Sequence, residues 1–130
     1  MSHHRTVISA SGAPKAAGPY SHAVVSRGLV FCSGQVPLDP ATGSLVEGTI
    51  GEQTVRCLEN LSTVCAAAGA RLEDAVRVGI YVTDMGTFAD VNAAYAGFFP
   101  AEPPARSTIA VVALPLGAQV EIDAVVALPD

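Results

Sequence analysis

Charged residues are scarce in this sequence, and some residue types are nearly or wholly absent. Asp, Glu, Lys and Arg make up 15% of the 130 residues, against 50% for apolar types, and tryptophan does not occur. Lysine occurs once, as Lys15, and the arginines are scattered, so the chain has no basic stripe that could neutralise phosphates. Because the formal net charge is also −5, we expect no nucleic acid among the direct ligands.

The spacings that metal and nucleotide sites require are also missing from the sequence. The three cysteines, Cys32, Cys57 and Cys65, include no CxxC pair, and no cluster of Cys, His and carboxylate residues has the spacing of a zinc site. His3 and His4 form a terminal pair, for which disorder is the better interpretation, and no GxxxxGK phosphate loop occurs. We therefore expect reduced, buried thiols and no metal site.

Long apolar runs are absent as well. No run reaches the roughly 18 residues of a membrane span, and neither end has a charged-then-apolar leader, so we expect a soluble, cytoplasmic protein. A chain of this length fits a single domain over residues 1–130. Its content of charged residues is low for a small monomer, which favours a protomer that buries surface against copies of itself. An alanine-rich proteome would also explain this low content.

Hydrophobic periodicity predicts an α+β chain. Two helices are expected to begin at the capping sequences Thr49–Glu52 and Thr87–Asp90, with Phe88 on the apolar stripe of the second. Arg27-Gly28 and the segment Leu114–Ala118 both read as tight hairpins. The expected strands cover residues 6–8, 23–26, 29–33, 76–82, 106–113 and 119–128. This βββαβαββ order favours a single mixed six-stranded sheet with both helices on one face.

The other face of the predicted sheet has no covering element and is too apolar for water. It carries Val125 and Ala127 and, depending on the pleat, either Ala110 and Val112 or Ile109 and Val111. An oligomer that packs these faces together would bury them.

Two charged residues stand inside the last two apolar strands, where an isolated charge costs several kcal/mol unless it is paired or used. Arg106 follows a Pro-rich turn, and its guanidinium is suited to hold a carboxylate by two parallel hydrogen bonds, although a structural ion pair is equally open. Glu121 points away from the buried face. It suits a proton shuttle if its surroundings raise its pKa, with solvent exposure or a salt bridge as the alternative. Asp123 shares its face.

Four segments in collinear order resemble the RidA family of enamine/imine deaminases, and together they span residues 18 to 123. They are Gly18-Pro19-Tyr20-Ser21, Phe31-Cys32-Ser33-Gly34-Gln35-Val36-Pro37, Val91-Asn92-Ala93-Ala94-Tyr95 with Phe98-Phe99, and Pro104 to Asp123. The resemblance implies a chorismate-mutase-like fold and a homotrimer with an inner barrel. It also implies a cofactor-free hydrolysis of 2-imino acids, such as 2-iminobutanoate and 2-iminopropanoate released by pyridoxal-phosphate enzymes, to 2-keto acids and ammonia.

The same resemblance assigns roles to particular residues. Arg106 would bind the substrate carboxylate, Glu121 would position or activate water, and Tyr20 would hydrogen-bond or stack in the site, with interface packing as its alternative. Thr108 stands where many members carry cysteine, and only its backbone is expected to matter. Further substrate-binding candidates are Ser33, Gly34, Asn92 and Phe88, although a strand cap, a surface amide and core packing are the ordinary explanations of Ser33, Asn92 and Phe88.

The predicted hairpin also sets the distance between the two charges. It places Glu121 opposite residue 111 or 112, which is roughly 17 to 20 Å from Arg106 along the strand. We therefore predict active sites that combine Arg106 of one chain with Glu121 of a neighbour, and an inactive monomer. A non-catalytic trimer that binds small carboxylates such as 2-keto acids is the competing interpretation, whereas a purely structural protein would not need Arg106 in an apolar strand.

Overall fold

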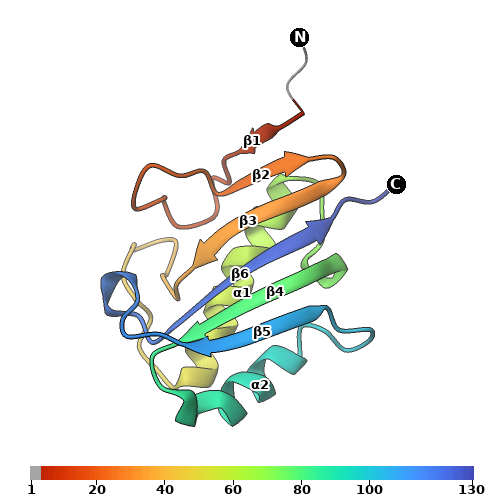
Figure 1. Cartoon of the computed structure of the whole chain (residues 1–130). Coiled ribbons are helices and arrows are strands. Elements are labelled where there is room, and N and C mark those ends of the chain that lie inside the picture. The colour runs from red at the N-terminus through yellow and green to blue at the C-terminus, as the bar shows by residue number, and fades with distance from the viewer. Residues whose placement is uncertain (1–3) are drawn as a thin grey trace.

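The computed structural model describes residues 4–130, which form one sheet and two α-helices (Figure 1). The helices are α1 (Ile50–Ala67) and α2 (Phe88–Ala96), and short 3-10 turns lie at Leu72–Asp74, Met85–Thr87 and Pro115–Gly117. The strands are β1 (Thr6–Ile8), β2 (Ala23–Ser26), β3 (Leu29–Gln35), β4 (Ala75–Val82), β5 (Ala105–Ala110) and β6 (Val120–Ala127). The predicted α+β class and βββαβαββ order are confirmed.

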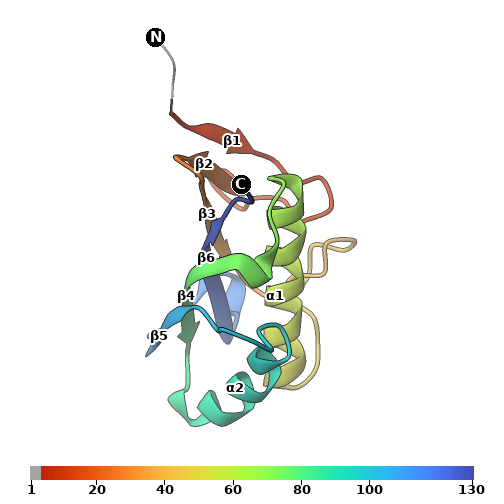
Figure 2. The same cartoon turned by 90° about the vertical axis from the view of Figure 1, so that its right-hand side faces the viewer.

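Both helices cover the same face of the sheet, as Figure 2 shows. Alternate residues of β6 face them: Val120, Ile122, Ala124 and Val126 are at most 3% exposed. The alternating residues of β6, Glu121, Asp123, Val125 and Ala127, are half-buried and lie on the uncovered face. The prediction of one helix-covered and one open face is therefore confirmed, while the homotrimer stays a prediction.

The last two strands do not form the predicted hairpin pair. The sheet order is β1-β2-β3-β6-β4-β5: β6 lies antiparallel between β3 and β4, and β5 runs parallel to β4 at the edge. β6 is hydrogen-bonded on both edges and buries every second residue under the helices, whereas most residues of β5 are exposed, as suits an edge. β5 also ends at Ala110 rather than 113, and Val112 is fully exposed.

The start of α1 agrees with the sequence, and the start of α2 does not. Thr49 and Glu52 form the predicted capping box of α1. Thr87 makes no side-chain cap at α2; instead Asp84 accepts the backbone N–H of Gly86 at 2.8 Å and begins the 3-10 turn that leads into the helix. Asp, Ser and Thr all serve as caps, so sequence alone does not settle which of two nearby candidates is used.

Smaller features of the chain are mostly as expected. Arg27 and Gly28 have φ values of 52° and 79°, which fits the tight hairpin between β2 and β3. Val76, expected on the apolar face of β4, is 47% exposed because the register shifts between Ala75 and Arg77. The cysteines are free and buried.

Two sequence predictions concern the chain end and membranes. His4 is exposed, and its predicted companion His3 lies outside the described residues. No helix within residues 4–130 has both the length and the apolar character needed to cross a membrane. The described residues contain no group of three or more His, Cys, Asp and Glu side chains arranged to hold a metal ion.

Candidate functional site

Arg106 lies on the helix-covered side of the edge strand β5, directly after the Pro103-Pro104 turn. Its Nη2 donates to Asn92 Oδ1 of α2 at 2.6 Å. The guanidinium carbon lies 4.8 Å from the ring centroid of Tyr95 and 5.7 Å from that of Phe88. In residues 4–130 the ion pairs within 4.0 Å involve Arg56 and Arg71 and not Arg106. The guanidinium therefore keeps donors for a ligand carboxylate, and the ion-pair explanation does not hold.

The partners of Arg106 come from one face of α2. Phe88, Asn92 and Tyr95 are four and three residues apart, which places them side by side on the helix. Phe88 is 40% exposed, so core packing, the alternative explanation of this residue, does not apply, and its role in substrate binding stays a prediction. Thr108 lies two residues beyond Arg106 on the same face, and its buried hydroxyl has no hydrogen-bond partner among the described residues. We call these five side chains the arginine half-site.

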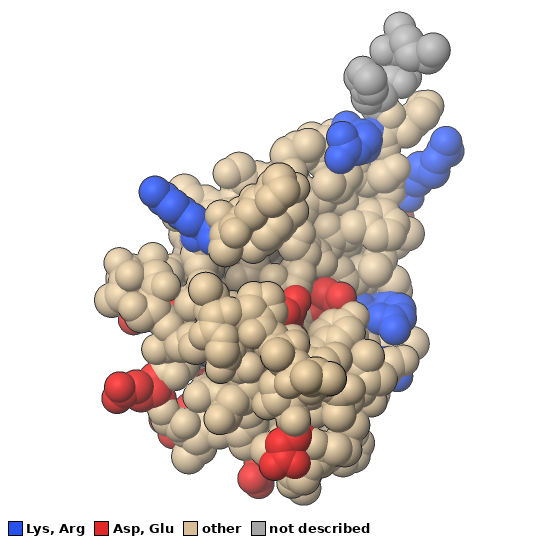
Figure 3. Space-filling view, turned by 60° about the vertical axis from the view of Figure 1, so that its left-hand side comes forward, with Lys and Arg blue, Asp and Glu red and all other residues tan. Residues whose placement is uncertain are grey.

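Glu121 lies on the opposite, uncovered face of the sheet. There it lines a cavity of about 290 Å³ whose walls come from the loop before β2, the end of β3 and the loop before β6. Figure 3 shows acidic atoms lying together beside a hollow in a mainly uncharged surface. We call Glu121 and the cavity residues Tyr20, Ser33, Gly34 and Leu116 the carboxylate half-site. Its volume lies near the lower end for ligand pockets, which suits a small substrate.

Two features of the cavity act directly on Glu121. Burial raises the pKa of the Glu121 carboxyl above its ordinary value, and the negative charge of Asp123 raises it further. Gly34 leaves the space that this carboxylate occupies, because a Cβ built at position 34 would lie 2.9 Å from Glu121 Cδ. The sequence made Gly34 a substrate-binding candidate, but in the structure its absent side chain makes room for Glu121.

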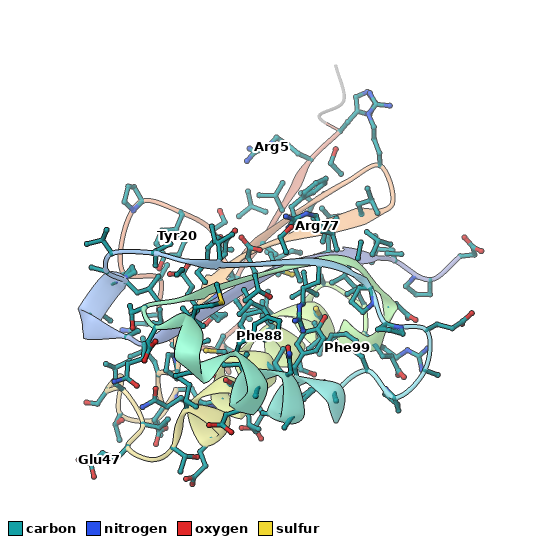
Figure 4. The ribbon with its side chains drawn as sticks, turned by 60° about the horizontal axis from the view of Figure 1, so that its bottom comes forward. Arg5, Tyr20, Glu47, Arg77, Phe88 and Phe99 are labelled. Carbon is teal, nitrogen blue, oxygen red and sulfur yellow. The ribbon has the colours of Figure 1, made fainter. Side chains whose placement is uncertain are left out.

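The two half-sites cannot meet within one chain. Arg106 pairs with Val78 of β4 and faces the helices, whereas Glu121 pairs with Tyr81, three residues or about 10 Å further along, on the other face. Figure 4 shows Phe88 between α2 and the sheet, and Tyr20 on the opposite side. The predicted separation of roughly 17 to 20 Å was calculated from a hairpin that does not form. The two charges are nevertheless kept apart, because they lie on opposite faces of the sheet.

Comparison with known proteins places the chain in a family. Residues 10–128 match the family described as Endoribonuclease L-PSP. The 2-iminobutanoate/2-iminopropanoate deaminase of Mus musculus is 42% identical over 121 residues, which cover 93% of this chain and 90% of that protein. The chain belongs to the RidA family.

Other RidA-like proteins extend the match. The RutC family protein y4sK of Sinorhizobium fredii is 48% identical over 121 residues, or 93% of this chain and 96% of the relative. The crystal structure of RidA from the Antarctic bacterium Psychrobacter sp. superposes with a TM-score of 0.91 at 36% identity, covering 95% of this chain and 99% of that one. The mixed sheet with two helices is thus the fold of the RidA family.

The remaining residues suggested by the RidA resemblance are anchored to the chain itself. Tyr20 is 48% exposed and its Oη accepts the backbone N–H of Ala17 at 3.0 Å, which leaves its own hydroxyl proton to donate. Ser33 donates its proton to the carbonyl oxygen of Ser21 at 2.6 Å. Ser33 therefore joins β3 to the Tyr20 loop, and only its lone pairs remain for a substrate.

Sequence reasoning missed two residues of this RidA site. His22 lines the cavity; its Nδ1 accepts the N–H of Ala10 at 2.9 Å, and its Nε2 lies 2.8 Å from the carbonyl oxygen of Pro14, so it fixes the loop that carries Tyr20. Tyr95 entered the sequence argument only as the end of a segment that resembles the RidA family. Its spacing of seven residues from Phe88 was the available signal, but nothing local places an arginine beside it.

Proposed function

We propose that the protein hydrolyses small 2-imino acids, of the 2-iminobutanoate and 2-iminopropanoate type, to 2-keto acids and ammonia. The names of its deaminase relatives support the substrate class. The observation that carries the proposal is Arg106, which is held by Asn92 and two rings and has no acidic partner within the described residues. Such a guanidinium is prepared for a planar carboxylate.

The active site is proposed to form between two chains of a homotrimer. The cavity around Glu121 contains no Arg106, and the arginine half-site contains no carboxylate, so each is incomplete alone. The apolar open face and the edge position of β5 suit packing against copies of the chain. Arg106 of one subunit would then hold the carboxylate of an imine that lies against Glu121 of the next.

The proposed chemistry requires only binding and proton transfer. Glu121 takes a proton from water while the water oxygen bonds to the imine carbon, and returns it to the nitrogen. A second transfer from the new hydroxyl to the amine lets the C–N bond break, so that ammonia leaves and the 2-keto acid remains. The Tyr20 hydroxyl and the backbone at Thr108 would orient the nitrogen. A pKa raised toward neutrality suits Glu121 to both directions of transfer.

The competing function, a trimer that merely binds small carboxylates, uses Arg106 equally well. It gives no reason for a carboxylate in the neighbouring cavity, where a negative charge would oppose the ligand. Cleavage of RNA, which the family description names, finds little support in a chain of net charge −5 with scattered arginines.

The test is keto-acid release from imines that an amino-acid oxidase generates in situ, measured for mixed oligomers of Arg106→Ala and Glu121→Gln subunits. Each variant alone should be inactive. After unfolding and refolding together in equal amounts, about one quarter of the interfaces should pair an intact Arg106 with an intact Glu121, and activity should return to that extent. Native mass spectrometry checks that the subunits have mixed.

Three results would contradict the proposal. An active isolated monomer, or mixed oligomers with no recovered activity, would exclude sites shared between chains. Folded wild-type oligomers that do not accelerate the reaction would leave the carboxylate-binding function in place of the deaminase.

A further inference from the structure

A second carboxylate lies beside Glu121 on the uncovered face. Asp123 is two residues further along β6 and points the same way, and Tyr81 of β4 is the direct register partner of Glu121. The Tyr81 hydroxyl reaches diagonally between the strands and donates to Asp123 Oδ2 at 3.0 Å. Tyr81 thus fixes Asp123 next to the carboxylate that lines the cavity.

Gly79 provides the space for this arrangement. It is the register partner of Asp123 in β4, and a Cβ there would lie 2.9 Å from Tyr81 Oη and would also collide with Asp123 Oδ1. A glycine in the middle of a strand destabilises it relative to alanine. The chain accepts that cost at the one position of β4 where a side chain would separate Tyr81 from Asp123.

The hydrogen bond makes the two carboxylates unequal. Two acids close together on one face do not ionise equally easily, and a hydrogen bond donated to one of them favours its charged form. Burial, and then the hydrogen bond to Asp123, raise the pKa of the Tyr81 phenol, so Tyr81 stays protonated and able to donate. Asp123 thus has a hydrogen-bond donor, whereas Glu121 has none within the described residues, and Glu121 is the acid left free to handle a proton.

We propose that Asp123, held by Tyr81 in the space left by Gly79, is a positioning residue whose negative charge strengthens Glu121 as a proton acceptor. The inference rests on the proposed function in one respect, namely that Glu121 handles the proton of the attacking water. It adds that the acid side of the site has two members with different tasks.

Other ionisable groups also face Glu121. Arg77 of β4 lies on the same face, near Gly79, and Lys15, Tyr20 and His22 line the same cavity. Within the described residues, neither Arg77 nor Lys15 forms an ion pair with Glu121. On the helix-covered side, the charge of Glu121 adds to burial in raising the pKa of the Cys57 thiol, which therefore stays neutral. The fixed charge that acts against ionised Glu121 is that of Asp123.

The experiment is a carboxyl ¹³C NMR titration of the intact oligomer, with Glu121 assigned by comparison with Glu121→Gln. Asp123→Asn keeps the shape of the side chain and an acceptor for Tyr81 but removes the charge. We expect the Glu121 midpoint to fall by about half a pH unit to one unit, and the acid limb of the pH–rate profile of kcat/KM to move with it.

Glu73→Gln is the matched control, since it removes one negative charge from an exposed turn and should leave the Glu121 midpoint unchanged. An unmoved Glu121 midpoint in Asp123→Asn would overturn the inference, whether or not the protein is a deaminase. A shifted midpoint in a protein without deaminase activity would support the coupling and sink the proposed function, because the titration needs no substrate.

Discussion

The two half-sites differ in how the chain holds them. In the arginine half-site, side chains from β5 and α2 hold one another: Asn92 accepts from Arg106, and two rings flank the guanidinium. In the carboxylate half-site, Glu121 has no hydrogen bond to a described residue in the structure, lies partly buried, and stands beside a second negative charge. In one half-site the charged group is held in place by its own chain, and in the other the acid lies partly buried beside a like charge.

This difference suits the two separate tasks proposed for the half-sites. A group that binds a carboxylate gains from being fixed before the ligand arrives, because less entropy is then lost on binding. A group that exchanges protons needs a pKa near the working pH, and burial beside a like charge provides that for a carboxyl. Opposite faces of one sheet let the chain build these environments independently.

Removing Arg106 should have the largest effect. Arg106→Ala loses two charge-assisted hydrogen bonds to the substrate, so kcat/KM in the imine assay should fall on the order of 10²- to 10⁴-fold. Arg106→Lys keeps the charge but not the planar fork and should recover only part of this. Arg5→Ala, at an exposed position before β1, is the control and should leave the rate unchanged. An unchanged kcat/KM in Arg106→Ala would show that the arginine half-site does not bind the substrate.

Filling the space at Gly34 should disturb only the carboxylate half-site. The added methyl of Gly34→Ala overlaps the Glu121 carboxylate, which must move aside, so we expect little loss of stability and a fall in kcat larger than the change in KM. Gly97→Ala is the matched control, since its Cβ would lie an ordinary 3.7 Å from Ala94 O. A fall in carboxylate affinity with kcat intact would show that Gly34 serves binding instead.

Both charged residues could be identified from the sequence, but their arrangement in the fold could not. Arg106 and Glu121 stand out because apolar strands rarely contain them, and the alternation of β6 correctly placed Glu121 away from the core. The strand order was missed because the turn signals of Leu114–Ala118 are local, whereas the position of β6 depends on which strand best fills the centre of the sheet. The contact between Tyr81 and Asp123 joins residues 42 apart, so only the finished register reveals it.

The smallest expected effect is the change in stability when Glu121 is replaced by glutamine. The pKa of Glu121 is raised in the folded protein, so the folded state binds the proton more tightly than the unfolded chain. Stability is then greatest below the unfolded pKa, about 4.3, and decreases as the pH rises through the folded value. Glu121→Gln cannot ionise and should raise Tm at neutral pH by a few degrees at most, because the side chain is only partly buried.

The same variant should match the wild type below about pH 4, where Glu121 is protonated in both states. Calorimetric scans at pH 4 and pH 7 measure both differences. A Glu121→Gln protein that is less stable than wild type at pH 7 would mean that some group satisfies the ionised carboxylate, and the contrast between the half-sites would disappear. A gain in stability at pH 7 alone, together with lost activity, would mean that the chain keeps an ionisable acid in the cavity against its own stability, as expected of a group retained for chemistry.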